Sequence, residues 1–348
     1  MIGKSPRVRV LIPYFGSWPD YFQSLFLPSC KRLEHIDFLF FNEAPAPIQA
    51  PGNTSFVQFT LADFNELATA RIGKQVALKR AYKLCDLKPF YGHVFAEFLD
   101  GYDYWGFGDI DLVFGDLERF LREPLARGRD IISCRAHWLS ASFCLMRNHP
   151  AINQLWLKSP SWSSVLATDE YLGFDECGGA FQELLAGQPI QQVGGRCHSM
   201  THVVRELERE GALSVSFADH ARESIRGDDY VVWDDGRVRA ANGEEFAYYH
   251  MVCEKGLLAF AHPKWSTLPQ CFHITPSGFY TLEELGIRRR LEVLRWLRGA
   301  ADKVFSMPAR VRAGVRREAA GQDASRSRSY WSALARLVGK RLPVRRTR

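Results

Sequence analysis

The chain has 348 residues, of which 46% are hydrophobic and 13% aromatic, so it can build a large core and is neither disordered nor fibrous. No apolar run approaches the roughly 20 residues of a membrane-spanning helix, so none is expected. The eight cysteines form no Cys-x-x-Cys pair, which excludes a typical zinc site or disulfide scaffold and indicates reduced thiols in a cytoplasmic protein.

The charge is unevenly distributed along the chain. Residues 288–348 contain 18 Lys and Arg against 4 Asp and Glu, whereas residues 1–287 contain 27 against 35. This contrast predicts a main domain at 1–287 and a basic extension at 288–348. An acidic body with a basic tail indicates an anionic partner for the tail.

The first 135 residues alternate between strand-like and helix-like segments. Strands are predicted at Arg7–Phe15, Ile36–Phe41 and Ser55–Thr60. Helices are predicted at Tyr21–Arg32, Leu61–Ile72 and Arg80–Leu99, the last with a break near Pro89. Such alternation predicts an α/β fold with a mainly parallel sheet, in which ligands bind at the carboxyl ends of the strands.

The second part of the chain is less regular. Further strands are predicted at 130–134, 139–147, 190–193 and 246–252, and a hairpin at 230–240. Further helices are predicted at 117–125, 151–157, 175–185, 203–211 and 281–299. The last of these is amphipathic and leads into the basic extension.

The aromatic run Tyr102–Asp116 places Asp109 and Asp111 two residues apart. Side chains at this spacing point to the same side of an extended strand, so both carboxylates can face one point beyond the strand end. Oxygen ligands of this kind suit Mg²⁺ or Mn²⁺. The alternative is a turn with solvated aspartates.

A short segment about twenty residues earlier concentrates charge. Lys83, Asp86 and Lys88 lie within six residues, and the first two share a helix face. They form either a solvated ion pair or a nucleotide pocket in which Asp86 accepts from ribose or base and the lysines balance phosphate charge. Glycine-rich dinucleotide and P-loop motifs are absent, as is the Gly-x-Ser-x-Gly of serine hydrolases.

The pairing of Tyr82-Lys-Leu-Cys-Asp-Leu-Lys-Pro89 with the Asp-x-Asp stretch resembles bacterial GT-A-fold glycosyltransferases related to capsular-polysaccharide and glycogenin-like sugar transferases. The resemblance covers roughly residues 8–255. It implies a Rossmann-like mixed sheet flanked by helices, here with a basic helical C-terminal extension. It also implies a nucleotide-sugar donor, most simply a UDP-sugar, bound through a metal on Asp109 and Asp111. Pro13 and Tyr14 then line the nucleotide.

The same resemblance assigns further residues. GT-A enzymes often supply a late histidine as third metal ligand, followed by a basic residue near the diphosphate, and His250 and Lys255 occupy such positions. The alternatives are a packed strand histidine and, as a rival ligand, His273. Ser140 and Ser142 lie where the family's strand approaches the donor sugar, although the usual Ser-Gly-His turn is absent.

Two adjacent carboxylates, Asp175 and Glu176, begin the predicted helix at 175–185. They serve either as ordinary helix-start acids or as catalytic groups facing the acceptor hydroxyl. An inverting enzyme would use one of them as general base, and a retaining enzyme would use one to stabilise the oxocarbenium-like state.

The sequence therefore predicts a metal-dependent glycosyltransferase using Mn²⁺ or Mg²⁺ and acting on a glycan or lipid-linked acceptor in surface polysaccharide biosynthesis. Arginines among apolar and aromatic residues in 288–348 favour binding to an anionic membrane surface, at the inner face of the membrane, over nucleic-acid binding or a solvated tail. The alternative functions are a metal-dependent phosphodiesterase or nucleotide-sugar hydrolase, and a non-enzymatic binding protein that uses its basic tail.

Overall fold

The computed structural model describes residues 5–226 and 229–287, which include most of a compact unit, Met1–Tyr280. A second unit, Thr281–Arg348, is described only as far as residue 287, and residues 282–287 are helical. The predicted basic extension and most of the helix predicted at 281–299 lie outside the described residues. The predicted domain boundary after residue 287 therefore stays a prediction.

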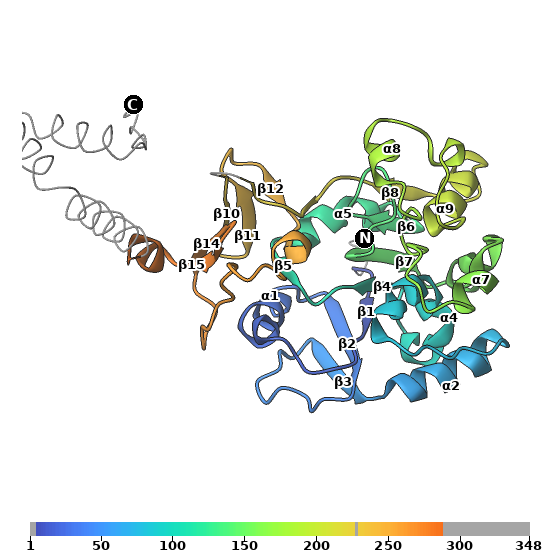
Figure 1. Cartoon of the computed structure of the whole chain (residues 1–348), viewed down its shortest axis with the longest axis horizontal. Helices are drawn as coiled ribbons and strands as arrows, with labels where there is room; N and C mark the ends of the chain where they lie inside the picture. Colours follow the sequence, from blue (N-terminus) through green and yellow to red (C-terminus); the bar gives the residue numbers. More distant parts are fainter. Residues whose placement is uncertain (1–4, 227–228, 288–348) are drawn as a thin grey trace, which may run out of the picture. The chain divides into compact units, whose positions relative to one another are not determined.

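A seven-stranded mixed sheet forms the centre of the first unit (Figure 1). Its strands, in spatial order, are β3 (Thr54–Gln58), β2 (Ile36–Asn42), β1 (Val8–Pro13), β4 (Tyr104–Gly108), β7 (Phe143–Arg147), β6 (Ile131–Ser133) and β8 (Val215–Phe217). The strands from β3 to β4 are parallel, whereas β7 is antiparallel to both β4 and β6. The predicted α/β fold with a mixed sheet flanked by helices is confirmed.

Both faces of the central part of this sheet are buried, which explains why β1, β2, β4 and β7 are apolar at most positions. Val10 and Phe38 contribute to the core on one face, and Leu11 and Leu39 to the core on the other. Successive residues of a strand point to opposite faces, so each strand supplies both cores.

Helices and helical turns cover the two faces. One face carries α2 (Leu61–Ile72), α3 (Leu84–Leu87), α4 (Tyr91–Val94), α6 (Pro150–Asn153), α7 (Trp162–Leu166) and α9 (Met200–Arg209). The other carries a π-helical turn at Phe22–Phe26, α1 (Leu27–Cys30) and α5 (Leu117–Ala126). The predicted bounds of α2 are confirmed, and its start is fixed by reciprocal hydrogen bonds between Thr60 and Asp63.

The helix predicted at 80–99 is instead a chain of short pieces. In addition to α3 and α4, the segment contains 3-10 turns at Ala81–Lys83, Lys88–Phe90 and Ala96–Leu99. The break at Pro89 was predicted, because proline lacks the amide hydrogen that a continuing helix needs. Gly92 lets the backbone approach Trp105 closely, because a Cβ atom at this position would collide with the Trp105 ring.

Two smaller sheets complete the unit. The first contains β5 (Leu112–Phe114), β13 (Tyr248–His250) and β9 (Ala221–Arg222). The second contains β12 (Glu245–Phe246), β11 (Arg237–Ala240), β10 (Val231–Asp234), β14 (Cys271–Thr275) and β15 (Gly278–Tyr280). The predicted hairpin is confirmed as β10 and β11, joined by Asp235 and Gly236 with positive φ values of 44° and 83°.

Two further predicted elements are wrong. Residues 174–179 form turns, and α8 begins only at Phe181 and ends at Leu185, so Asp175 does not begin a helix. Gly178 and Gly179 have φ values of 64° and 90°, which break helical geometry at this point. The strand predicted at 190–193 is a 3-10 turn, Ile190–Gln192.

Within residues 5–226 and 229–287, no helix is long and apolar enough to cross a membrane. All eight cysteines lie in this part of the chain, and none forms a disulfide, as the sequence predicted.

Candidate functional site

The Asp-x-Asp stretch lies in the short connection between β4 and β5. β4 is buried along its whole length and ends at Gly108, beside the carboxyl end of the parallel strand β1. The Asp109 amide donates to the Ser142 carbonyl at 3.0 Å, and the Asp111 carbonyl accepts from the Met251 amide at 3.0 Å. The connection is thus held by backbone hydrogen bonds on both sides, which fixes where its two side chains project.

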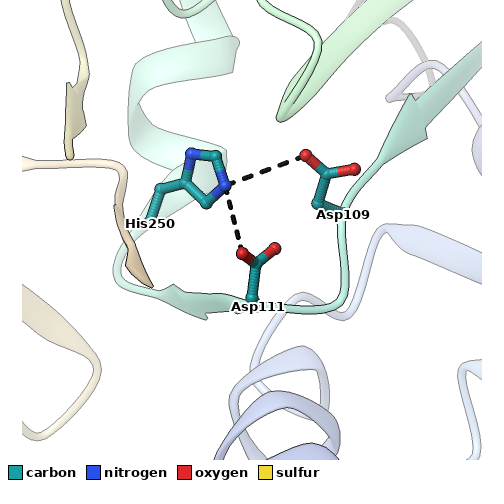
Figure 2. Close-up of side chains that lie close together, drawn as sticks. All are labelled: Asp109, Asp111 and His250. Atoms are coloured by element: carbon teal, nitrogen blue, oxygen red, sulfur yellow. Dashed lines mark ion pairs between the residues drawn. The ribbon is translucent and has the colours of Figure 1, made fainter. Parts of the chain in front are cut away.

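Strand pairing brings His250 to these aspartates. β13 is antiparallel to β5, with His250 opposite Leu112. His250 Nε2 lies 3.4 Å from Asp111 Oδ2 and 3.8 Å from Asp109 Oδ2, and Figure 2 shows the three side chains converging. One ligand atom from each residue falls within 4.8 Å of the others.

This donor set fits a divalent cation. Two carboxylates and an imidazole are suitable ligands for Mn²⁺ and Mg²⁺, with Mn²⁺ accepting nitrogen more readily. The other imidazole nitrogen, Nδ1, lies 3.4 Å from Glu223 Oε1, which orients the ring so that Nε2 faces the aspartates. The rival histidine, His273, lies in β14 and is not part of this group.

Two lysines balance the charge of the aspartates. Lys88 Nζ donates to Asp109 Oδ1 at 2.6 Å, and Lys255 Nζ donates to Asp111 Oδ2 at 2.6 Å. Burial alone would lower the pKa of each ammonium, but the aspartates raise the pKa of both lysines above their ordinary value. Both lysines are therefore cationic and placed to meet an anionic ligand.

The electrostatic coupling also acts on the candidate ligands themselves. Burial alone would raise the pKa of the Asp111 carboxyl, but His250 and Lys255 hold it below its ordinary value. Burial lowers the pKa of His250, but Asp111, Glu223 and Asp109 raise it to about 10. Without a cation the group is therefore an imidazolium between carboxylates.

These residues line a cleft of about 710 Å³. Of the residues predicted from sequence, those that line the cleft are Pro13, Tyr14, Lys88, Asp109, Asp111, Ser142, Asp175, Glu176, His250 and Lys255. The size is typical of a site for a nucleotide-sized ligand. Segments separated by more than two hundred residues therefore meet in one cavity.

Lys83 and Asp86 do not line this cleft, although both were predicted to contact a donor. Both side chains are fully buried, and Lys83 Nζ donates to Asp86 Oδ2 at 2.7 Å. The Asp86 carboxylate also accepts from the Leu172 and Phe174 amides at 2.8 and 2.7 Å. The pair therefore fastens α3 to the segment that leads into Asp175, and its predicted contact with a donor stays a prediction.

Ser140 and Ser142 belong to a buried hydroxyl cluster. Tyr248 Oη lies 3.2 Å from Ser140 Oγ and 2.8 Å from Ser142 Oγ, and the two serine oxygens are 3.0 Å apart. Only Ser142 lines the cleft. Ser140 and Tyr248 do not line the cleft, and both contact the Ser142 hydroxyl group.

The acid pair Asp175 and Glu176 also lines the cleft. Tyr171 lies between them, with its hydroxyl 3.0 Å from Asp175 Oδ1 and 3.1 Å from Glu176 Oε2. Burial, followed by the Glu176 charge, raises the pKa of Asp175 well above its ordinary value, and burial raises the pKa of Glu176 to about 6.

Sequence reasoning missed three residues of the site. Tyr171 bridges the acid pair, Glu223 orients His250, and Arg135 lies 3.7 Å from Glu223. None belongs to a recognisable spacing, since each reaches the cleft from a loop whose path depends on tertiary contacts. The only local signal was Tyr171 itself, an aromatic residue close to two consecutive acids.

Comparison with known proteins places the chain in a family. Residues 10–283 match the family model described as "Family of unknown function (DUF6625)". The chain belongs to this family. All candidate site residues of the chain fall within the matched range. No curated protein matches the sequence.

A structural comparison yields a distant resemblance. The crystal structure of mouse xyloside xylosyltransferase 1 in its apo form matches with a TM-score of 0.38 and 10% sequence identity. The match covers 72% of the present chain and 99% of the mouse chain.

Proposed function

We propose that this protein is a metal-dependent glycosyltransferase, which moves a sugar from a nucleotide-diphosphate sugar to a hydroxyl group of a glycan or lipid-linked acceptor. One observation carries the proposal: Asp109, Asp111 and His250 converge in a large cleft, with the cationic side chains of Lys88 and Lys255 directly beside them. A cation site flanked by lysines suits a diphosphate, because a diphosphate binds both hard cations and ammonium groups.

The three ligand residues would hold Mn²⁺ or Mg²⁺. When bound, such a cation stabilises the negative charge that develops on the diphosphate leaving group. Lys255 is half-exposed in the cleft, so its ammonium group can contact a phosphate when a cation takes its place beside Asp111. Lys88 is buried and holds Asp109 in place through its ion pair.

The nucleotide is proposed to lie against the ends of β1 and the adjoining loop. Pro13 and Tyr14 line that wall, and the Tyr21 and Tyr82 rings also border the cleft. Aromatic faces of this kind stack well on nucleobases. A uridine diphosphate sugar is the proposed donor, as the resemblance to GT-A enzymes implied.

The acceptor is proposed to approach the wall that carries Asp175 and Glu176, where a carboxylate can take up the hydroxyl proton. We further propose a role in surface polysaccharide biosynthesis at the cytoplasmic face of the membrane. The support for this location is the basic composition of residues 288–348, which suits an anionic lipid surface.

A thermal-shift screen of nucleotide sugars, with UDP as the first probe, tests the proposal in the presence and absence of Mn²⁺. A ligand that binds only the folded state raises the apparent melting temperature by mass action. We expect a shift with UDP that requires Mn²⁺ and is lost in Asp111→Ala. Asp100→Ala, at an exposed position outside the cleft, is the matched control.

The outcomes separate the alternatives. Equal stabilisation by UDP with and without Mn²⁺, or unchanged stabilisation in Asp111→Ala, contradicts the proposal. Release of free sugar from a bound nucleotide sugar, at a rate that acceptors do not change, identifies a nucleotide-sugar hydrolase. Binding without turnover across a panel of glycan and lipid-linked acceptors identifies a binding protein.

A further inference from the structure

The Tyr171 hydroxyl makes two contacts that a single proton cannot satisfy. It lies 3.0 Å from Asp175 Oδ1 and 3.1 Å from Glu176 Oε2. An ionised carboxylate only accepts hydrogen bonds, and a phenol donates only one. If both acids were ionised, the phenol could donate to only one of them, and the other carboxylate oxygen would face the phenolic oxygen with no hydrogen atom between them. One of the acids must therefore carry a proton and donate it to the phenolic oxygen.

Burial identifies which acid carries the proton. The side chain of Asp175 is fully buried, and its second oxygen, Oδ2, has no hydrogen-bond partner in the described part of the chain. Glu176 is partly exposed and lines the cleft. A buried carboxylate without a partner costs far more free energy than a neutral carboxyl group. The proton therefore belongs on Asp175.

The charged surroundings agree with this assignment. The charged groups that act on the pair from neighbouring elements are Asp86 in α3, Lys88 in the following 3-10 turn, Asp109 after β4 and Glu223 after β9. Only one of these four is a cation, and its ammonium group is bonded to Asp109.

The neighbouring thiols and phenols are neutral, and the Arg196 guanidinium donates to the Tyr171 backbone carbonyl at 3.3 Å rather than to either acid. The thiols Cys85, Cys177 and Cys197 have pKa values that burial raises to about 12. Burial likewise raises the pKa values of the nearby phenols Tyr82 and Tyr91 above their ordinary value. Lys88 is thus the cation that acts most strongly on the pair, and because its ammonium group is bonded to Asp109 it does not balance a second carboxylate at this point.

We propose that Asp175, Tyr171 and Glu176 form a directed proton chain, in which a neutral Asp175 donates to Tyr171 and Tyr171 donates to Glu176. Glu176 is then the one ionised member of the pair, with its free oxygen at the cleft surface. Asp175 and Tyr171 are positioning residues, because they act on a ligand only through Glu176. The directions of the pKa shifts given above agree with this arrangement.

The use of this chain in catalysis rests on the proposed glycosyltransferase function. In that reaction the acceptor oxygen forms a bond to the anomeric carbon and gives its proton to Glu176. The bond between that carbon and the phosphate oxygen breaks, and its electron pair leaves with the nucleoside diphosphate. A glutamate with a pKa of about 6 is a suitable base for this step near neutral pH.

Infrared spectroscopy of the full-length protein tests the proton chain without any ligand. A protonated carboxyl group shows a carbonyl stretch that carboxylates lack, and at pH 8 ordinary Asp and Glu residues are ionised. We expect this band in the wild type and in Glu176→Gln, and its loss in Asp175→Asn. Absence of the band from the wild type, or its loss in Glu176→Gln with retention in Asp175→Asn, would overturn the assignment.

Urea unfolding supplies an independent measurement. A buried Asp175 that is neutral when folded but ionised when unfolded must bind a proton on folding, which disfavours the folded state as the pH rises. Asn needs no such proton. We expect the ratio of the wild-type unfolding constant to that of Asp175→Asn to increase about tenfold for each pH unit between about pH 5 and 8. A ratio that stays constant across this range contradicts the proposal.

Asp86→Asn is the matched control for this variant, because Asp86 is equally buried but is paired with Lys83 and two backbone amides. It should not produce the increase with pH. The infrared and urea results do not depend on the reaction catalysed. A protein that shows both signatures but transfers no sugar retains the proton chain and refutes only the proposed function.

Discussion

Two pairs of acids share one cleft but differ in how their charge is balanced. Asp109 and Asp111 lie within 4.0 Å of Lys88, Lys255 and His250, all of which are cationic when no metal is bound. Asp175 and Glu176 have only the Tyr171 hydroxyl between them. The first pair therefore stays ionised and suits a cation, whereas the second retains a proton and suits proton transfer. The number of adjacent cations, rather than the carboxyl group itself, decides the chemistry.

The largest expected effect comes from removing a cation from the balanced pair. In Lys88→Met the part-buried Asp109 carboxylate loses its ammonium partner, and the cation that lowers the pKa values of Asp175 and Glu176 is lost as well. Breaking a buried ion pair by removing one partner costs about 3–5 kcal/mol. Urea unfolding at pH 7 measures the loss. Lys79→Met, whose side chain is 81% exposed, is the control and should change stability by less than about 1 kcal/mol.

The next effect concerns the identity of the third ligand. We expect His250→Ala to weaken Mn²⁺ binding about hundredfold, or about 2.7 kcal/mol, because it removes the only nitrogen donor of the group. His273→Ala, at the rival position predicted from sequence, should leave the affinity unchanged. Calorimetric titration with Mn²⁺ compares the two variants. A larger loss in His273→Ala would transfer the third-ligand role to that residue.

A smaller effect is expected from the pH dependence of Glu176. Its pKa is raised from 4.5 to about 6, so the folded state holds this proton more tightly than the unfolded state. Its contribution is therefore most favourable below pH 4.5 and is lost as the pH rises through 6. The loss amounts to about 2 kcal/mol. In Glu176→Gln this part of the pH dependence should disappear from urea unfolding curves measured between pH 4.5 and 7.

The smallest effect is expected from the phenol that joins the two acids. Tyr171→Phe removes one hydrogen-bond donor and one acceptor, which costs about 1 kcal/mol, and it should raise the pKa of Glu176 further. Chemical-shift titration of the glutamate carboxyl carbons follows that pKa. Tyr82→Phe is the control, because the Tyr82 ring contacts Tyr171 but has no hydroxyl contact with either acid among the described residues. A pKa of Glu176 that falls in Tyr171→Phe would reverse the assigned direction of donation.

The sequence predicted most of the elements whose cause is local. β1, β2 and α2 were found because apolar spacing acts within a few residues, and the Thr60 cap that the structure shows at the start of α2 is equally local. The segments at 80–99 and 174–185 were misread for tertiary reasons. The first is buried on several sides and is broken into turns, and the second is held open by glycines with positive φ.

The residues of the site likewise differ in whether the local sequence reveals them. Asp109 and Asp111 could be predicted because their spacing is short and their strand is strongly apolar. The expected extended geometry is only partly correct, because the pair lies in the connection between β4 and β5, where the chain bends at residues 110–111. His250 came from family resemblance alone. Glu223 and Tyr171 could not be predicted, because their partners lie in other parts of the chain or depend on loop conformation.

The pairing of β5 with β13 determines which insertions the site can tolerate. Asp111 and His250 are 139 positions apart, yet the hydrogen-bonded register between Leu112 and His250 sets their separation. The chain length between the two strands is therefore free to vary at surface loops, such as the exposed turn at 241–244. Insertions there should leave the ligand geometry intact, whereas a one-residue slip of β13 would turn His250 to the opposite face of its sheet.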